Sequence, residues 1–222
     1  MTRAVVIGAK GGIGSALVAA LEEEEATVRG FARPELDILD EASIAAAASS
    51  ISAPPSLIVV ATGMLHEEGA GPEKSMRELD AGRMSLSFAV NTIGPALVAK
   101  HFLPLLAKGE RSVFAILSAR VGSITDNRLG GWYSYRASKA ALNQLIRTLS
   151  IEMKRINDRA IIVGLHPGTV DTNLSKPFQA NVAPGQLFDS GRAAVQLLDV
   201  IDGLTVKDSG NILAWDGTTI AP

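Results

Sequence analysis

Residues 4–14 have the sequence Ala-Val-Val-Ile-Gly-Ala-Lys-Gly-Gly-Ile-Gly, an apolar run that leads directly into a glycine-rich turn. Ile13, Leu17 and Leu21 follow at helical spacing, so the segment predicts a strand, a tight turn and a helix. Such a turn offers backbone N–H groups and the positive end of a helix, which suit a phosphate group. Glycines also form ordinary turns, and it is the flanking strand and helix that favour phosphate binding here.

Predicted strands and helices alternate along the rest of the chain. Further strands are predicted at Thr27–Ala32, Leu57–Ala61, Ser112–Leu117, Ala160–Leu165 and Asn211–Ala214, and helices at Glu41–Ser52, Ala81–Leu106, around Tyr135 and at Gly191–Ile201. This alternation predicts a single Rossmann-type domain over residues 1–222, an α/β fold with a doubly wound parallel sheet. Ligands bind at the carboxyl ends of the strands in such sheets.

Two connections in this pattern are unusual. Asp37 and Ile38 follow the second strand almost at once, which leaves no room for a helix there, so we expect one trimmed crossover. Residues 173–189 show little periodicity and are predicted to form a loop that folds over a site. Phe178 and Phe188 in this loop predict apolar pocket walls.

Composition narrows the class of protein. A chain of 222 residues, 47% hydrophobic and 20% charged, suits one globular domain with a substantial core. The absence of cysteine excludes disulfides and thiolate chemistry and agrees with a reducing compartment. A net charge of −2 gives no reason to expect nucleic acid or an anionic membrane as a partner.

Neither targeting nor metal signals are found. Residues 1–3 lead straight into the first strand without room for a signal peptide, and no apolar run reaches transmembrane length, so we expect a cytoplasmic protein. His66, His101 and His166 are scattered without the spacing of metal ligands. We therefore expect no metal site.

The segment Ser118–Asn143 contains both tyrosines of the chain. Strong helix formers follow Gly130-Gly131, and on a helix Lys139 lies one turn beyond Tyr135 on the same face. A phenol with a pKa near ~10 is a poor proton shuttle at neutral pH, but a fixed ammonium lowers that pKa. The pair can then give a proton to a carbonyl oxygen or take one from a hydroxyl. A surface Tyr and Lys that happen to be four residues apart is the alternative.

The end of the second strand bears on the choice of cofactor. In dinucleotide-binding folds the residue at this position contacts the adenosine ribose. An acidic side chain there binds a 2′-hydroxyl, and a basic side chain binds a 2′-phosphate. Here it is Arg33, and Lys10 in the glycine turn can supply a second cation. We therefore expect NADP(H) rather than NAD(H); an arginine that points into solvent is the alternative.

Asn91 is a polar residue within the long helix predicted over Ala81–Leu106. It falls on one face with Met84, Phe88 and Pro95, and that face is otherwise apolar. Pro95 has no N–H to bond the carbonyl of Asn91. A buried amide beside a freed carbonyl is costly unless water or another group satisfies both. A purely structural proline kink explains the helix equally well.

Taken together, the motifs resemble the short-chain dehydrogenase/reductase family over nearly the whole chain. The matching pieces, in order, are Gly8-x-x-x-Gly12-x-Gly14, Asp37-Ile38, Ala61-Thr62-Gly63, Asn91, Tyr135-x-x-x-Lys139 and Pro167-Gly168-Thr169-Val170-x-Thr172. Each is moderately specific, and their order and spacing together are strongly so. The short length, residues 130–139 and the trimmed crossover further resemble its small C-factor-like branch.

The resemblance implies a role for each matching residue. Tyr135 would be the general acid/base, Lys139 would lower its pKa and hold the nicotinamide ribose, and Asn91 would anchor a water that leads protons to Lys139. With the two cations argued above, the expected cofactor contacts are Gly8, Lys10, Gly12, Ile13, Gly14, Arg33, Asp37, Ile38, Ala61, Thr62, Gly63, Tyr135, Lys139, Pro167, Gly168, Val170 and Thr172.

The sequence departs from the family at the serine that would polarise the substrate carbonyl. Counting back from Gly122, this position is Ala119. Ser118 precedes it but would point the other way if the strand continues, and Ser123 lies nearby in the loop. We assign the role to Ser118 first and Ser123 second; a site without this hydroxyl is the third alternative.

The sequence therefore predicts an NADP(H)-dependent oxidoreductase that moves hydride between nicotinamide and a small carbonyl or alcohol substrate. The alternative is a catalytically weak NAD(P)-binding sensor or signalling protein, which Ala119 and the short chain favour. The resemblance also implies a homodimer or homotetramer, and Ala137 and Ala141 would allow close approach of helices.

Overall fold

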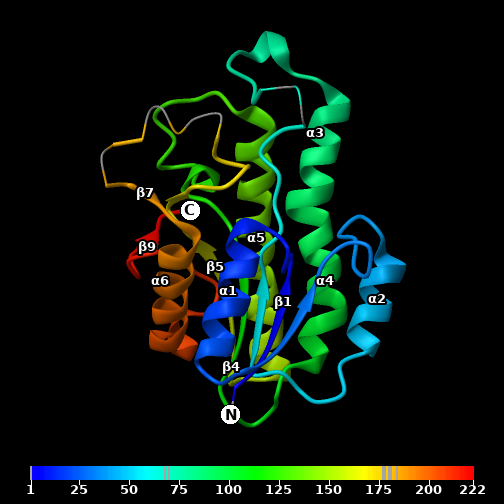
Figure 1. Ribbon diagram of the computed structural model, residues 1–222. Helices are drawn as coiled ribbons and strands as arrows, with labels where there is room; N and C mark the ends of the chain where they lie inside the picture. The colour runs from blue at the N-terminus through cyan, green and yellow to red at the C-terminus, as the bar shows by residue number, and fades with distance from the viewer. Residues whose placement is uncertain (1, 68, 70, 177–178, 180–181, 184) are drawn as a thin grey trace.

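The computed structural model describes residues 2–67, 69, 71–176, 179, 182–183 and 185–222. Their main feature is a seven-stranded sheet with the order β2-β1-β3-β4-β5-β8-β9, parallel except for the antiparallel last pair (Figure 1). Its strands are β1 (Arg3–Ile7), β2 (Thr27–Phe31), β3 (Leu57–Val60), β4 (Ser112–Leu117), β5 (Ala160–His166), β8 (Ile212–Ala214) and β9 (Thr219–Ile220).

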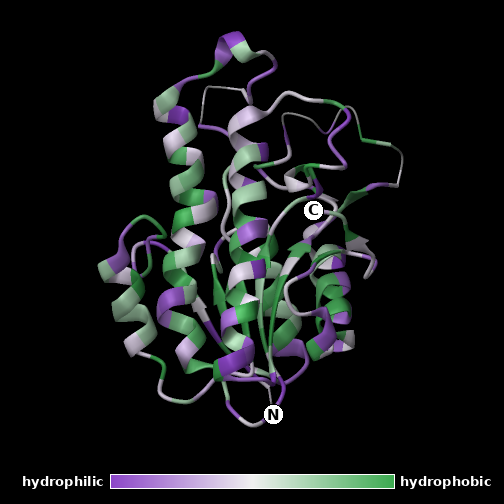
Figure 2. Cartoon of the chain, turned by 180° about the vertical axis from the view of Figure 1, so that it is seen from behind, coloured by the Kyte–Doolittle hydropathy of each residue, from purple (hydrophilic) through white to green (hydrophobic). Residues whose placement is uncertain are grey.

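Helices cover both faces of this sheet. They are α1 (Gly12–Glu23), α2 (Glu41–Ser49), α3 (Ala81–Phe88), α4 (Gly94–Phe102), α5 (Tyr133–Ile156) and α6 (Ser190–Gly203). Side chains alternate between faces along each strand. Val5 and Ile7 of β1 therefore pack with α2, α4 and α5, while Ala4 and Val6 pack with α1 and α6. Figure 2 shows mostly hydrophobic strands behind helices that carry both hydrophilic and hydrophobic residues.

The strand order reverses between β1 and β3. From β1 the chain moves outward to β2, returns to β3 on the other side of β1, and continues through β4 and β5. The crevice at such a reversal, beyond the carboxyl ends of the strands, is where open α/β sheets bind ligands. The glycine turn after β1 and residues 61–63 after β3 border this crevice.

The trimmed crossover is confirmed. Residues 32–40 between β2 and α2 contain no helix. Asp40 caps α2, because its carboxylate accepts a hydrogen bond of 3.0 Å from the N–H of Ala42. The helix ends at Ser49, three residues before the predicted Ser52.

The prediction of one continuous helix from Ala81 to Leu106 was wrong. The segment is divided into α3, a π-helical turn η2 (Ala89–Ile93), α4 and a 3₁₀ turn η3 (Leu103–Leu105). The cause is Pro95, which cannot donate to the carbonyl four residues earlier, so the ladder widens at Asn91. The face that carries Asn91 is also more polar than predicted, since Ser87 is buried beside it.

Near the carboxyl end, the structure adds strands that were not predicted. β6 (Thr169–Val170) pairs with β7 (Leu187–Phe188), so the segment predicted as a loop from Asn173 to Asp189 ends in a small parallel ladder. β9 was also missed, because two-residue strands leave no periodic signal. Short turns complete the chain: η1 (Met76–Glu78), η4 (Arg120–Gly122) and η6 (Val206–Asp208).

Candidate active site

The glycine turn after β1 is built for close approach of backbone. Gly8 has φ +90°, and a Cβ on Gly14 would lie 2.1 Å from the Gly8 carbonyl oxygen. α1 starts without a side-chain cap at Gly11, so its first N–H groups have no side chain bonded to them at that position. Side chains are thereby kept away from a helix N-terminus, which leaves room for an anionic group.

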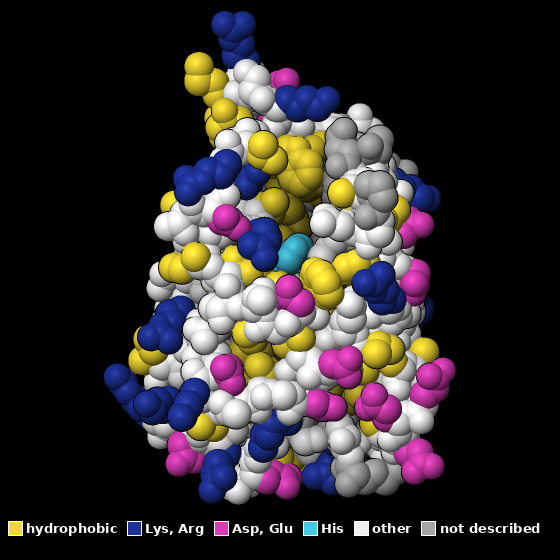
Figure 3. Space-filling model, turned by 90° about the vertical axis from the view of Figure 1, so that its left-hand side faces the viewer, with side chains coloured by type: hydrophobic (Ala, Val, Ile, Leu, Met, Phe, Trp, Pro, Cys, Tyr) yellow, Lys and Arg dark blue, Asp and Glu magenta, His cyan; other side chains and the backbone are white. Residues whose placement is uncertain are grey.

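Two cavities meet at this turn. One, of about 620 Å³, extends toward α5, and the other, of about 700 Å³, extends toward the end of β2. Both are lined by Lys10, Gly11 and residues 61–63, so together they form one crevice along the edge of the sheet. Figure 3 shows a hollow on this side of the molecule, with hydrophobic side chains, a histidine and basic side chains around it.

Nearly all the predicted cofactor residues line this crevice. The cavity toward β2 is bordered by Gly8, Lys10, Arg33, Asp37, Ile38, Ala61, Thr62 and Gly63. The cavity toward α5 is bordered by Lys10, Gly12, Ile13, Ala61, Thr62, Gly63, Tyr135, Lys139, Pro167, Gly168, Val170 and Thr172. Gly14 lines neither cavity and packs against the backbone of Gly8. Thr62 Oγ1 is buried and has no hydrogen-bond partner among the described residues, so a polar ligand would satisfy it.

Tyr135 and Lys139 lie together at the wall of the cavity that extends toward α5. Both are buried, at 8% and 2% exposed, and Lys139 Nζ is 5.9 Å from the centroid of the tyrosine ring. The ammonium donates a 2.8 Å hydrogen bond to the carbonyl oxygen of Leu117, at the end of β4. The helical spacing therefore places the two side chains next to each other, as predicted. The hydrogen bond to Leu117 at the end of β4 fixes the position of the lysine ammonium.

The pKa of the Tyr135 phenol differs from the expectation. Burial raises the pKa of Tyr135 above its ordinary value, and burial lowers the pKa of Lys139 to about 8. The predicted lowering of the phenol pKa is thus outweighed by loss of solvent. The ammonium of Lys139 donates its hydrogen bond to the carbonyl oxygen of Leu117. A phenol in this setting stays protonated at neutral pH, so the proton that a carbonyl reduction needs is present on Tyr135.

Asn91 is fully buried in the π-helical turn behind this pair. Its Oδ1 accepts from the N–H of Met64 at 2.9 Å, and its Nδ2 donates to the carbonyl of Met64 at 2.8 Å and to Ser138 Oγ at 3.1 Å. A Cβ on Gly63 would lie 3.6 Å from Asn91 Oδ1 and 3.7 Å from Lys139 Nζ. Asn91 therefore holds the chain after β3 next to the lysine.

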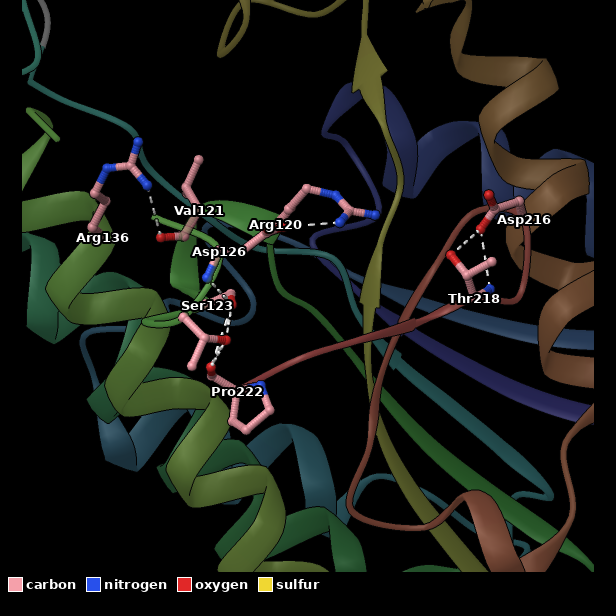
Figure 4. Close-up of polar contacts among 9 residues, drawn as sticks. Arg120, Val121, Ser123, Asp126, Arg136, Asp216, Thr218 and Pro222 are labelled. Atoms are coloured by element: carbon pink, nitrogen blue, oxygen red, sulfur yellow. Dashed lines mark hydrogen bonds and ion pairs between the residues drawn. The ribbon is translucent and has the colours of Figure 1, made fainter. Parts of the chain in front are cut away.

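The serines near Tyr135 have protein partners. Ser118 lines the cavity, but its hydroxyl donates a 2.6 Å hydrogen bond to Asn143 Oδ1 on α5. Donation to a substrate would require this bond to be exchanged, and the catalytic role of Ser118 stays a prediction. Ser123 is turned toward Pro222 and bonds the N–H of Asp126 at 3.1 Å (Figure 4). Ala119 packs against Tyr135.

Sequence reasoning missed several residues of the cavity wall. Arg120, Val121, Trp132, His166 and Leu174 all line it. Their signal was position in the chain. Arg120 lies three residues after the end of β4 and His166 ends β5, and ligands bind at these strand ends. Figure 4 shows the Arg120 side chain extending toward the end of β5, away from Ser123.

The aromatic wall was placed incorrectly. Phe188 does not face either cavity; it is buried and packs on Trp215 with ring centroids 4.8 Å apart. The reason is that β7 pairs with β6, which turns Phe188 under Gly168. Phe178 lies outside the described residues.

His166 makes a prediction about acid stability. Burial, together with the nearby guanidinium of Arg120, lowers the pKa of His166 to about 4. The unfolded chain takes up the proton near pH ~6.5, so stability should fall as the pH drops from about 6.5 to about 4, by up to about 3 kcal/mol. Urea unfolding at the two ends of this window should show a smaller loss for His166→Gln than for the wild type. An equal loss in both proteins would show that this histidine does not cause it.

Comparison with known proteins assigns the class. The fold and crevice are those of a dinucleotide-binding oxidoreductase, and the sequence profile of the short chain dehydrogenase family matches residues 34–183. The chain therefore belongs to the short-chain dehydrogenase/reductase family, whose members are NAD(P)-dependent oxidoreductases.

Individual relatives agree with this assignment. The C-signal protein of Myxococcus xanthus is 36% identical over 146 residues, covering 66% of this chain and 82% of the relative. The 1-hydroxy-2-glutathionyl-2-methyl-3-butene dehydrogenase of Rhodococcus sp. (strain AD45) is 33% identical over 187 residues, covering 83% and 77%. NADPH-bound carbonyl reductase from chicken fatty liver superposes with a TM-score of 0.81 at 25% identity, covering 100% of this chain and 94% of that one.

Neither a membrane-spanning helix nor a cluster of metal ligands is found among the described residues. No helix in them is long and apolar enough to cross a membrane. Nor do three His, Cys, Asp or Glu side chains gather there as metal ligands would.

Proposed function

We propose that the protein is an NADP(H)-dependent carbonyl reductase or alcohol dehydrogenase with Tyr135 as its general acid/base. The observation that carries this proposal is the shared cavity: Tyr135 and Lys139 line the same 620 Å³ space as Gly12, Thr62 and Thr172. A proton donor is thus placed in the crevice that the glycine turn prepares for a dinucleotide.

The cofactor supplies or accepts the hydride when bound, and the chain's own residues manage the proton. In reduction, Tyr135 donates its phenolic proton to the oxygen of the carbonyl group as negative charge develops there. Lys139, held by Leu117, stabilises the phenolate that results. Asn91 keeps Met64 and Ser138 in place beside this pair, where it would also anchor the water that returns the proton.

Arg33 and Lys10 support NADP(H) as the cofactor. Both line the cavity at the end of β2, where the adenosine ribose is expected, and no acidic side chain replaces Arg33. The chicken carbonyl reductase, whose structure contains NADPH, shares this fold over the whole chain.

Arg33→Asp tests the choice of cofactor. Losing one charge-assisted contact to a phosphate, and placing a like charge there, should weaken NADPH binding by at least about 10-fold relative to NADH. Fluorescence titration with each cofactor measures this ratio, and Arg29→Asp is the control, since Arg29 lies on β2 outside the cavity. If both variants keep the wild-type ratio, Arg33 does not contact the 2′-phosphate.

The substrate space is mixed in character. Val121, Trp132 and Leu174 give it apolar walls, and Arg120 and His166 add polar groups. This suits a small aldehyde or ketone with an apolar body. The predictions of a homodimer or homotetramer and of a cytoplasmic location remain predictions; Ala137 and Ala141 stay partly exposed on α5, as close helix packing would require.

The decisive assay is cofactor oxidation over a panel of aldehydes and ketones with both NADPH and NADH. We expect turnover with at least one class of carbonyl compound and a preference for NADPH. Micromolar NADPH binding without turnover across the panel would contradict the proposal.

That outcome would favour a second candidate function, an NAD(P)-binding signalling protein. Two observations support it: a relative at 36% identity is named C-signal, and Ala119 stands where the family has a serine. The intact Asn91, Tyr135 and Lys139 argue against it, because a protein that only binds cofactor has no need of a proton donor.

A further inference from the structure

The first turn of α5 lacks the local signals that start a helix. Gly130, Gly131 and Trp132 precede it with φ values of +64°, +65° and +53°, and the N-cap residue Trp132 makes no side-chain capping bond. The N–H groups of a first helical turn have no partner within the helix and fray easily when they are uncapped. Tyr135 lies in this turn, so the position of its hydroxyl depends on what fixes the turn.

Glu73, some sixty residues earlier in the chain, fixes this turn. Its carboxylate accepts hydrogen bonds from the Ser134 N–H, at 3.3 Å, and from the Ser134 hydroxyl. Its backbone carbonyl accepts from the N–H of Trp132 at 2.5 Å. Glu73 is 5% exposed, so its charge is buried against the positive end of α5, where an anion is favoured.

The segment that carries Glu73 is held at its other end as well. Met64 is bonded to Asn91 through both its N–H and its carbonyl. Leu65 packs with Ala119 and Tyr135 in a small cluster of their own. In Figure 1 residues 61–67 rise from β3 toward the start of α5. Contacts with the start of α5 and its surroundings are thus made at Met64 and Leu65 and again at Glu73.

We propose that Glu73 is a positioning residue that caps α5 from a distance and so fixes Tyr135 and Trp132 at the cavity. The inference deepens the function proposed above and rests on it for its kinetic part. Loss of the carboxylate leaves buried donors of Ser134 unsatisfied and releases the first turn. Glu73 touches neither the cavity nor the reacting atoms, so it acts through Tyr135.

Glu73→Ala and Glu73→Gln test the proposal, with Glu67→Gln as the matched control. Glu67 is a carboxylate in the same segment, but it is exposed, so its change alters charge alone. Displacement of a reacting group by about 1 Å can cost about 100-fold in rate. We therefore expect Glu73→Ala to lower kcat by roughly 10- to 100-fold with a much smaller change in KM and in NADPH affinity. Glu73→Gln, which keeps one acceptor oxygen, should lie between Glu73→Ala and the wild type.

A second measurement does not depend on catalysis. Trp132 and Trp215 are the two tryptophans of the chain, so in a Trp215→Phe background the emission reports Trp132 alone. Glu73→Ala and Glu73→Gln should make that emission more accessible to acrylamide, whereas Glu67→Gln should leave it unchanged. If the wild type shows no turnover, the proposed function fails and the kinetic test cannot be made. The tryptophan emission would still show whether Glu73 fixes the first turn of α5. The inference would be overturned if both Glu73 variants showed the same accessibility of the emission to acrylamide as the Glu67→Gln control. Where the wild type has turnover, their kcat would also have to match that control.

Discussion

Replacement of Tyr135 by phenylalanine is expected to lower turnover by roughly 10²–10⁴-fold, the usual contribution of a general acid. The ring remains, so its packing against Leu65 and Ala119 is kept, and only the proton donor is lost. NADPH affinity should stay within about 5-fold of the wild type, since one neutral hydrogen bond contributes roughly 1 kcal/mol or less net. Steady-state kinetics on the best carbonyl substrate and a fluorescence titration with NADPH measure the two quantities.

Tyr133 supplies the control for this prediction. It is the other tyrosine of the chain, lies two residues away in the same helical turn, and is 38% exposed. Tyr133→Phe removes the same hydroxyl chemistry from a position outside the cavity lining, so its turnover should remain close to wild type. Equal turnover in both variants would refute the role of Tyr135.

The other large effect is expected from Gly14→Ala. A Cβ at this position would lie 2.1 Å from the carbonyl oxygen of Gly8, and backbone cannot rotate away as a side chain can. The turn must therefore shift, at a cost of about 1–3 kcal/mol or more in unfolding free energy. NADPH binding should weaken by at least about 10-fold, because the displaced turn no longer presents its N–H groups to the phosphates. Urea unfolding and NADPH titration test the two parts.

Gly203→Ala is the matched control for this glycine. It lies at the end of α6, and a Cβ there meets nothing within 4 Å. Its stability should change by no more than about 0.5 kcal/mol, as for most surface substitutions. If Gly14→Ala binds NADPH and unfolds like Gly203→Ala, the close packing within the turn does not matter for the site.

The parts of the fold that follow from periodicity were predictable. The buried strands β1, β3, β4 and β5 are continuous apolar runs, and their order along the chain with the intervening helices specifies a parallel sheet. The crevice followed from the same rule, since it lies at the carboxyl ends of those strands. The Tyr135–Lys139 pair was also predictable, because helical spacing alone brings the two side chains together.

What could not be predicted depends on contacts between distant segments. Glu73 caps α5 across about sixty residues, and no local pattern relates it to Ser134. Ser118 faces Asn143 because β4 ends against α5, which is a matter of packing rather than of sequence. The raised pKa of Tyr135 has the same origin: burial by neighbouring segments outweighs the adjacent ammonium, and burial is not readable from a four-residue spacing.

The most direct test is a crystal structure of the protein with NADP⁺ bound. The predicted result places the nicotinamide in the cavity beside Tyr135 and Lys139, with both side chains directed at it and the adenosine phosphate against Arg33. A nicotinamide bound outside this cavity, or a Tyr135 hydroxyl turned away from it, would contradict the assignment of Tyr135 as the proton donor.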